Sequence, residues 1–231
     1  MDLVNWTGDT YRLIPSRFPP VAVYEGLVLP ERLDQLAKVE DITNPRLRSL
    51  DRIARTTHET PETSARLQNW NLAPFAYGNP EGSTFFNEDR PCLEVADSPQ
   101  TSLAVSVAKR EMFLKRTSEP STGIDMRMLK TPLSGNFWDL RAIGETSKEE
   151  RWAMGANLPA EADGIIYRPP ERPSGISFAV VNGRALGKAI QAVHYRYVWN
   201  GKAIAEIYAF DEIGRIIEAN SLKSETDVLA A

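Results

Sequence analysis

Cysteine and histidine are scarce in this sequence. Its 231 residues include one cysteine, Cys92, and two histidines, His58 and His194. A single cysteine cannot form an internal disulfide and cannot supply a cysteine-based metal cage. The two histidines lie far apart in the sequence, and neither belongs to an HExxH-type spacing. The sequence therefore predicts no metal site.

A strong excess of charge and a long apolar run are missing as well. The formal net charge is −4, whereas binding to nucleic acid or to anionic membranes favours clustered Lys and Arg. No apolar stretch approaches the ~20 residues of a membrane span. The first residues do not follow the charged-then-apolar pattern of a signal peptide. We therefore expect a cytoplasmic protein that binds neither nucleic acid directly nor membrane.

The length and composition are those of one ordinary globular domain. Hydrophobic residues make up 42% of the chain and charged residues 25%, which is typical of a folded protein with a sizeable core. We expect a single domain over 1–231, with an ordered core at about 10–210 and a polar, frayed tail at 221–231.

Hydrophobic periodicity and turn signals predict an α+β fold with a mixed sheet and packed helices. The segment 43–87 is rich in Asn, Pro, Thr and charge, so we expect it to be irregular, either as a functional surface or as a plain insertion. Strands are expected at 10–14, 90–96, 123–131, 135–141, 163–167, 175–182, 191–198 and 202–210, and helices at 30–42, 98–115 and 147–157.

Three local signals are especially clear. Ser98 followed by Pro99 is an N-cap with proline in the first helical turn. The helix that follows is apolar around most of its circumference, which predicts that it is buried against the sheet. Ser147 and Glu150 have the spacing of a capping box. Asn200-Gly201 between two apolar-alternating segments is typical of a type I′ hairpin turn.

Two features have both a structural and a functional interpretation. Cys92 is a candidate nucleophile if the fold brings His194 to it, although a lone cysteine in a strand is more often a small buried hydrophobe. The strand residues Tyr195, Tyr197 and Trp199 share one face at period two. We interpret them as core and cross-strand packing, with a stacking wall for an aromatic ligand as the alternative. The short basic clusters, such as Lys109-Arg110, are interpreted as solvated faces.

An ordered set of short segments extends this interpretation over roughly residues 10–210. The set resembles the longer branch of the RES-domain family. Its segments are YRLIPSRFPP (11–20), ITNPRLR (42–48), APFAYGNPEGSTFF (73–86), TSLAV (101–105), GIDMR (123–127), DGIIY (163–167) and HYRYVWNGK (194–202).

The resemblance implies a fold like that of ADP-ribosyltransferases and an activity on NAD. RES-domain proteins are typically toxins that cleave NAD at the nicotinamide–ribose bond or transfer ADP-ribose. The resemblance also implies a cognate antitoxin protein of the Xre type as partner. A homodimer is equally compatible with it.

The chemistry-bearing positions of the family match this sequence unevenly. Arg12, after Tyr11, matches an arginine on the first strand. A second family arginine would fall near Thr84, a strand tyrosine on Glu94, a helix glutamate on Val105 or Ser106, and a helix serine near Arg151. No glutamate lies between Leu103 and Arg110. Four of the five positions therefore differ from the family pattern.

Two hypotheses follow from this mixture. In the first, the site is rearranged: Glu94 supplies the catalytic carboxylate that stabilises an oxocarbenium-like ribose, while Arg12, with Tyr11 beside it, and Arg151 hold NAD. In the second, the protein is a catalytically inactive RES-like scaffold that binds a protein partner. Retention of the fold favours the first hypothesis, and Val105 in place of the helix carboxylate favours the second.

Overall fold

The computed structural model describes residues 2–16, 74–75 and 79–229. The helix expected at 30–42 and most of the irregular segment 43–87 lie outside the described residues. The elements are β1 (Leu3–Pro15), β2 (Leu93–Ala96), α4 (Pro99–Thr117), β3 (Thr122–Asp139), α5 (Lys148–Ala156), β4 (Gly164–Tyr167), β5 (Ser177–Val180), η2 (Gly183–Ala185), β6 (Ile190–Trp199), β7 (Ile204–Phe210), β8 (Ile216–Glu218) and η3 (Ala219–Lys223).

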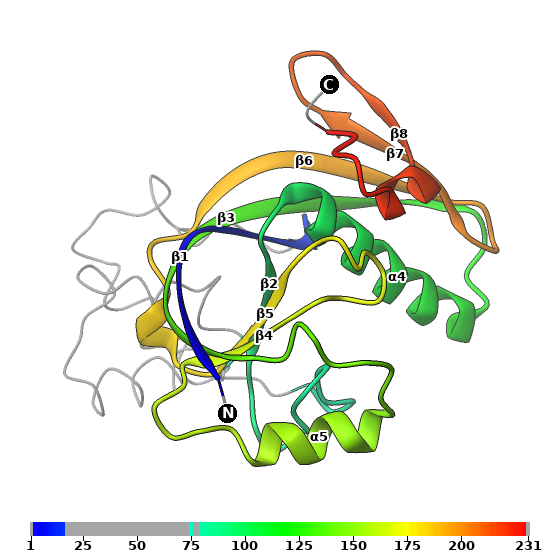
Figure 1. Ribbon diagram of the computed structural model, residues 1–231. Coiled ribbons are helices and arrows are strands. Elements are labelled where there is room, and N and C mark those ends of the chain that lie inside the picture. Colours follow the sequence, from blue (N-terminus) through cyan, green and yellow to red (C-terminus); the bar gives the residue numbers. More distant parts are fainter. Residues whose placement is uncertain (1, 17–73, 76–78, 230–231) are drawn as a thin grey trace, which may run out of the picture.

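The strands form one mixed sheet of eight strands, in the order β1-β2-β5-β4-β3-β6-β7-β8. Only β3 and β4 pair in parallel, and the other pairs are antiparallel. Because β1 also pairs with β3 along its whole length, strands β1, β2, β5, β4 and β3 close into a ring. The strands β6, β7 and β8 extend from β3 beyond this ring (Figure 1). The chain is thus an α+β single domain with two described α-helices.

The predicted break between strands 123–131 and 135–141 was wrong, because β3 runs unbroken from Thr122 to Asp139. Proline disfavours the middle of a sheet because it has no N–H to donate. Pro132 lies between the part of β3 that pairs with β6, up to Lys130, and the part that pairs with β4, from Phe137. Long pairing with β1, from Leu3 to Pro15, carries the strand through this gap.

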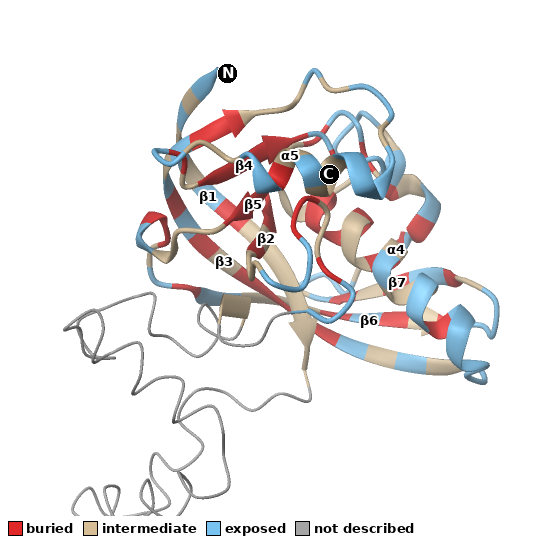
Figure 2. Cartoon of the chain, turned by 90° about the horizontal axis from the view of Figure 1, so that it is seen from below, coloured by how far each residue is buried: buried red, intermediate tan, exposed pale blue. Residues whose placement is uncertain are grey.

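Helix α4 begins where the sequence predicts. The Ser98 side chain accepts a hydrogen bond from the Thr101 backbone N–H at 3.2 Å, and Pro99 is the first helical residue. Burial changes along the helix: Leu103, Ala104 and Val107 are buried, whereas Met112 and Phe113 are 52% and 56% exposed (Figure 2). The expectation of a buried helix is therefore confirmed for the N-terminal half, whereas in the C-terminal half Leu114 is buried and most other side chains are exposed.

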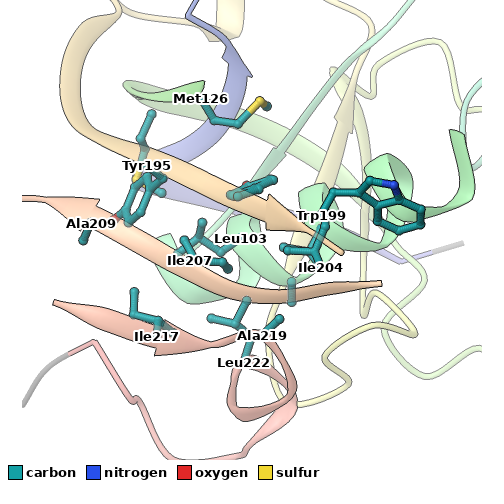
Figure 3. Packing of buried hydrophobic residues seen from close by; sticks show 14 of the residues in the cluster. Leu103, Met126, Tyr195, Trp199, Ile204, Ile207, Ala209, Ile217, Ala219 and Leu222 are labelled. Atoms are coloured by element: carbon teal, nitrogen blue, oxygen red, sulfur yellow. The ribbon is translucent and has the colours of Figure 1, made fainter. Parts of the chain in front are cut away.

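The largest core cluster lies between α4 and the strands β3, β6 and β7 (Figure 3). Tyr195, Tyr197 and Trp199 belong to it and are nearly inaccessible to solvent. The polar atoms of two of them are satisfied: the Tyr197 hydroxyl donates to Ser106 Oγ at 3.0 Å, and Trp199 Nε1 donates to the Glu119 carbonyl at 3.0 Å. The core interpretation of this aromatic strand is confirmed.

The two other local signals had different outcomes. The Ser147–Glu150 capping box is present at the start of α5. The type I′ turn is not, because such a turn needs positive φ at both central residues, and of the two only Gly201 has it. The Asn200 side-chain oxygen instead accepts from the backbone N–H groups of Lys202 and Ala203, closing a longer loop.

The C-terminal segment is not frayed over its described part. Gln100 Nε2 donates to the backbone carbonyls of Leu222, Ser224 and Thr226, and its Oε1 accepts from the Val228 N–H. These bonds tie the segment to the first turn of α4. The segment is ordered through its backbone carbonyls, which its polar composition does not reveal.

Candidate functional site

A cleft of about 560 Å³ opens between the second half of β1, strand β2 and helix α4. Its volume lies within the range of ordinary small-molecule sites. The pairing of Tyr11 with Ala96 brings β1 beside β2, and α4 follows β2 after two residues, Asp97 and the N-cap Ser98. Three of the predicted site residues, Tyr11, Arg12 and Glu94, line this cleft.

Both carboxylate oxygens of Glu94 have partners in the cleft. Its Oε1 accepts from Thr84 Oγ1 at 2.6 Å and from the Thr84 backbone N–H at 3.1 Å. Its Oε2 pairs with the ammonium of Lys109, on α4. The Glu94 side chain is 20% exposed, so the carboxylate is held firmly and is still reached by solvent.

Lys109 and Thr84 together keep Glu94 ionised. Burial by itself raises the pKa of Glu94, but the charge of Lys109 and the hydrogen bonds from Lys109 and Thr84 outweigh it. The net effect is a pKa below the ordinary value. Burial lowers the pKa of Lys109, and the attraction to Glu94 more than compensates, so that pKa is raised. Both groups are therefore charged at neutral pH.

Three cations of the described residues line this cleft. They are Arg12, Lys109 and Arg110, and Glu94 is the one carboxylate among the described lining residues. Burial lowers the pKa of Arg12 to about 10, which still leaves its guanidinium positive at neutral pH. A cleft wall that carries several cations suits an anionic ligand.

Aromatic side chains form part of the cleft wall. Tyr11, Phe113 and Tyr167 all line it. The Tyr167 hydroxyl donates to Thr84 Oγ1 at 3.4 Å. Burial, followed by the negative charge of Glu94, raises the pKa of Tyr167 well above its ordinary value, so the phenol stays protonated. Such surfaces pack well against flat heterocycles.

Arg151 does not line the cleft. From α5 its guanidinium donates to the backbone carbonyls of Thr84, at 3.2 Å, and Thr146, at 2.6 Å. Trp152, the next residue, donates from Nε1 to the Ser83 carbonyl at 3.0 Å. Through these contacts α5 holds the loop that positions Thr84, and Thr84 in turn holds Glu94.

The five positions that the family resemblance singles out gather around this one cleft. Arg12, Glu94, Val105 and Ser106 line it, Thr84 binds Glu94, and Arg151 binds the carbonyl of Thr84. Positions far apart in the sequence are thus placed together.

Cys92 also lines the cleft, but His194 does not. His194 lies on β6, where it pairs with Arg127 of β3 and Phe210 of β7. Burial, followed by the charge of Glu94, raises the pKa of Cys92 to about 12. The protonated thiol fits the interpretation of Cys92 as a small hydrophobe.

Sequence reasoning missed Lys109, Thr84 and Tyr167. Lys109 is exposed and Arg110 is half-buried, as expected for a solvated face, but both residues also line the cleft. Helical spacing could have identified Lys109, since it follows Val105 by four residues and lies on the same face of α4. Nothing local marks Thr84 as the partner of Glu94, ten residues away.

The described residues contain neither a metal-ligand cluster nor a helix suited to span a membrane. Within residues 2–16, 74–75 and 79–229, no group of three or more His, Cys, Asp or Glu side chains is placed to hold a metal ion. Over the same ranges, no helix combines the length and apolarity that a membrane crossing requires.

Comparison with known proteins places the chain beside one bacterial protein. No family model matches the chain. The uncharacterized protein y4oC of Sinorhizobium fredii is 54% identical over 231 residues, which is 100% of both chains. Identity at this level over the full length requires the same fold and a common origin. The chain therefore belongs to the same family as y4oC.

Proposed function

We propose that this protein is a RES-type enzyme with an ADP-ribosyltransferase-like fold and a rearranged active site, which cleaves NAD at the nicotinamide–ribose bond or transfers its ADP-ribose. The observation that carries the proposal is the presence of Arg12 and Glu94 in one cation-rich cleft of about 560 Å³. A dinucleotide needs a cationic grip on its pyrophosphate beside a carboxylate near the ribose.

The reaction places specific demands on the carboxylate. The bond between the ribose C1′ and the nicotinamide nitrogen breaks, and its electron pair goes to the ring nitrogen, which becomes neutral. The ribose passes through an oxocarbenium-like state that a nearby negative charge stabilises. Water, or a nucleophile on an acceptor, then bonds to C1′ and loses a proton. Glu94 supplies this negative charge, because its pKa is below the ordinary value.

The remaining residues bind the substrate. Arg12 grips the pyrophosphate, since it stays charged in its buried position. Tyr11 and Tyr167 offer aromatic surface to the nicotinamide ring. Arg151 acts on Glu94 indirectly, because its guanidinium donates to the carbonyl of Thr84, which binds Glu94. We therefore assign it a positioning role in place of the phosphate contact expected from the sequence.

Two observations favour a second function, a catalytically inactive scaffold that binds a protein partner. Val105 and Ser106 line the cleft where the RES family carries its helix carboxylate. Glu94, the carboxylate that is present, is paired with Lys109. On this alternative the same cleft binds an anionic group without turnover.

The RES resemblance extends the proposal to partners and location. We propose a cytoplasmic toxin that is neutralised by an Xre-type antitoxin, with a homodimer as the alternative assembly. Co-expression with the product of the adjacent reading frame, followed by size-exclusion chromatography, tests this. Recovery of free monomer alone would count against both assemblies.

The test of the activity is release of free nicotinamide from NAD by the purified protein. The proposal predicts release by the wild type, its loss in Glu94→Gln, and a raised KM in Arg12→Ala. Glu206→Gln is a suitable control, because Glu206 is an exposed carboxylate of β7 that does not line the cleft. If the wild type binds ADP-ribose but releases no nicotinamide, the scaffold function replaces the enzymatic one.

A further inference from the structure

The two oxygens of Glu94 are held by partners of very different mobility. Oε1 accepts two hydrogen bonds from Thr84, whose backbone is itself held by α5. Oε2 pairs with Lys109. In the described part of the chain, no other group donates to Oε2. One oxygen is therefore anchored and the other depends on a single flexible side chain.

Lys109 is well placed to leave Glu94. Its side chain is 47% exposed, compared with 20% for Glu94. Ion pairs with an exposed partner contribute little net stability, roughly 0–1 kcal/mol, because water competes for the charges and the long side chain loses freedom. Lys109 also lines the same cleft as Arg12 and Arg110. An anion that enters between these cations thus offers the ammonium an alternative partner.

We propose that Lys109 is an exchangeable cation, which pairs with Glu94 in the free protein and moves to a phosphate group when a diphosphate-bearing ligand enters the cleft. This inference rests on the proposed function, because it takes the ligand of the cleft to carry a diphosphate. The exchange leaves Glu94 Oε2 without its cation while Thr84 keeps the carboxylate in place. The two hydrogen bonds from Thr84 also lower the pKa of Glu94 and so favour its ionised form. Ligand binding thereby unmasks the negative charge of Glu94.

The exchange regulates the site through the identity of the ligand. Without a phosphate group in the cleft, Lys109 neutralises the carboxylate and disfavours its use. With a diphosphate bound, the carboxylate is free beside the ribose. Lys109 is thus a binding residue that selects for anionic ligands, and it makes the exposure of Glu94 conditional on them.

Binding measurements test the exchange without reference to turnover. Calorimetric titration with ADP-ribose and with inorganic pyrophosphate is done on four proteins: wild type, Glu94→Gln, Lys109→Met and the double variant. Lys109→Met should weaken binding of both ligands roughly 10- to 100-fold, the value of one charge-assisted hydrogen bond. Glu94→Gln should tighten binding, because the ligand no longer competes with the carboxylate for Lys109.

The decisive comparison is the effect of Glu94→Gln on ligand binding in the wild type and in Lys109→Met. Glu94→Gln removes the repulsion between the carboxylate and the anionic ligand in both proteins. It removes the competition between Glu94 and the ligand for the Lys109 ammonium only where Lys109 is present. The tightening should therefore be about two- to fivefold greater when Lys109 is present than when it is methionine. Equal factors in the two backgrounds overturn the exchange, as does unchanged binding in Lys109→Met or failure of the wild type to bind either ligand.

Controls separate the exchange from misfolding and from the proposed activity. Lys115→Met changes a lysine of the same helix that pairs with Glu111 outside the cleft, and it should leave both affinities unchanged. Lys109→Gln serves as a second variant if Lys109→Met folds poorly. Nicotinamide release with equal factors rejects the exchange alone. Unequal factors without nicotinamide release reject the proposed enzymatic function alone.

Discussion

Thr84 donates two hydrogen bonds to the same oxygen of Glu94, one from Oγ1 at 2.6 Å and one from its backbone nitrogen at 3.1 Å. Thr84 belongs to the turn before β2, and its carbonyl accepts from Arg151 of α5. The orientation of Glu94 thus depends on α5, a helix that does not itself line the cleft. Variants that disturb the contacts from Arg151 through Thr84 to Glu94 should change the position and pKa of Glu94 more than they change the sheet.

The hydroxyl of Thr84 can be removed with little change in volume. In Thr84→Val the backbone bond to Glu94 remains, whereas the shorter side-chain bond and the acceptor of the Tyr167 hydroxyl are lost. The pKa of Glu94 should therefore rise from its lowered value. A lowered carboxyl pKa stabilises the fold above the unfolded value of 4.5 and loses this contribution as pH falls through the folded pKa. Thr84→Val should therefore be less stable by about 1 kcal/mol near neutral pH, and the difference should shrink in acid.

Titration of carbon-13-labelled glutamate by NMR, with Glu94→Gln to assign the signal, measures this pKa directly. Denaturant unfolding at neutral and acidic pH measures the stability difference. Thr7→Val is a control, since the Thr7 hydroxyl pairs with Ser134 on an exposed part of β1 and β3. A Glu94 pKa that is unchanged in Thr84→Val would show that Lys109 alone determines it.

The contact between α5 and the turn before β2 depends on a glycine. A Cβ at Gly155 would lie 1.8 Å from the Phe85 carbonyl oxygen, whereas one at Gly144 would have nothing within 4 Å. Gly155→Ala must displace the backbone beside Thr84, so it should cost several kcal/mol, as overpacked sites do. Gly144→Ala should change stability by less than about 0.5 kcal/mol. Urea unfolding of the two variants compares them directly, and equal stability would contradict the close approach.

Local signals in the sequence were sufficient for much of the fold. Ser98-Pro99 and the Ser147–Glu150 pair specify helix starts through contacts with residues close in sequence. The starts of α4 and α5 were therefore predictable. The aromatic strand was recognised as core because Tyr195, Tyr197 and Trp199 alternate at period two. These features depend on contacts within a few residues.

Features that depend on distant partners were not predictable in the same way. Pro132 suggests a strand break until β1 is known to pair with β3 along its length. The C-terminal segment has no apolar pattern, and it is ordered by Gln100, more than a hundred residues away. For the same reason Thr84 and Lys109 were not recognised, although the cleft residues Tyr11, Arg12 and Glu94 were.

The C-terminal segment also satisfies a buried arginine. Arg172 is 7% exposed, and it donates to the carbonyls of Ser224 and Glu225 and to Thr101 Oγ1. Arg172→Gln cannot reproduce this fork, so it should destabilise the protein by about 3 kcal/mol. Arg168→Gln should cost little, because Arg168 is exposed and donates to the Pro173 carbonyl. Hydrogen exchange should show loss of protection at residues 222–228 in the first variant only, and similar exchange in both would refute the role of Arg172.

Cys92 provides a chemical probe of the cleft because it is the single cysteine of the chain. Only the thiolate reacts with iodoacetamide, and the pKa of about 12 leaves almost none of it near neutral pH. Alkylation of the folded protein should therefore be much slower than alkylation of the urea-unfolded protein, although Cys92 lines the cleft. Burial is the largest cause of the raised pKa, Glu94 adds to it, and Lys109 opposes it.

The directions in which Glu94 and Lys109 shift the pKa of Cys92 predict the order of the alkylation rates of the variants. Glu94→Gln removes a negative neighbour and should speed alkylation of Cys92, whereas Lys109→Met removes a positive neighbour and should slow it, each by a few-fold. Lys115→Met, on the same helix but outside the cleft, should leave the rate unchanged. Mass spectrometry over time gives all four rates, including the wild type, on one site. The reverse order for Glu94→Gln and Lys109→Met would mean that access to the cleft, and not the local charge, controls the thiol.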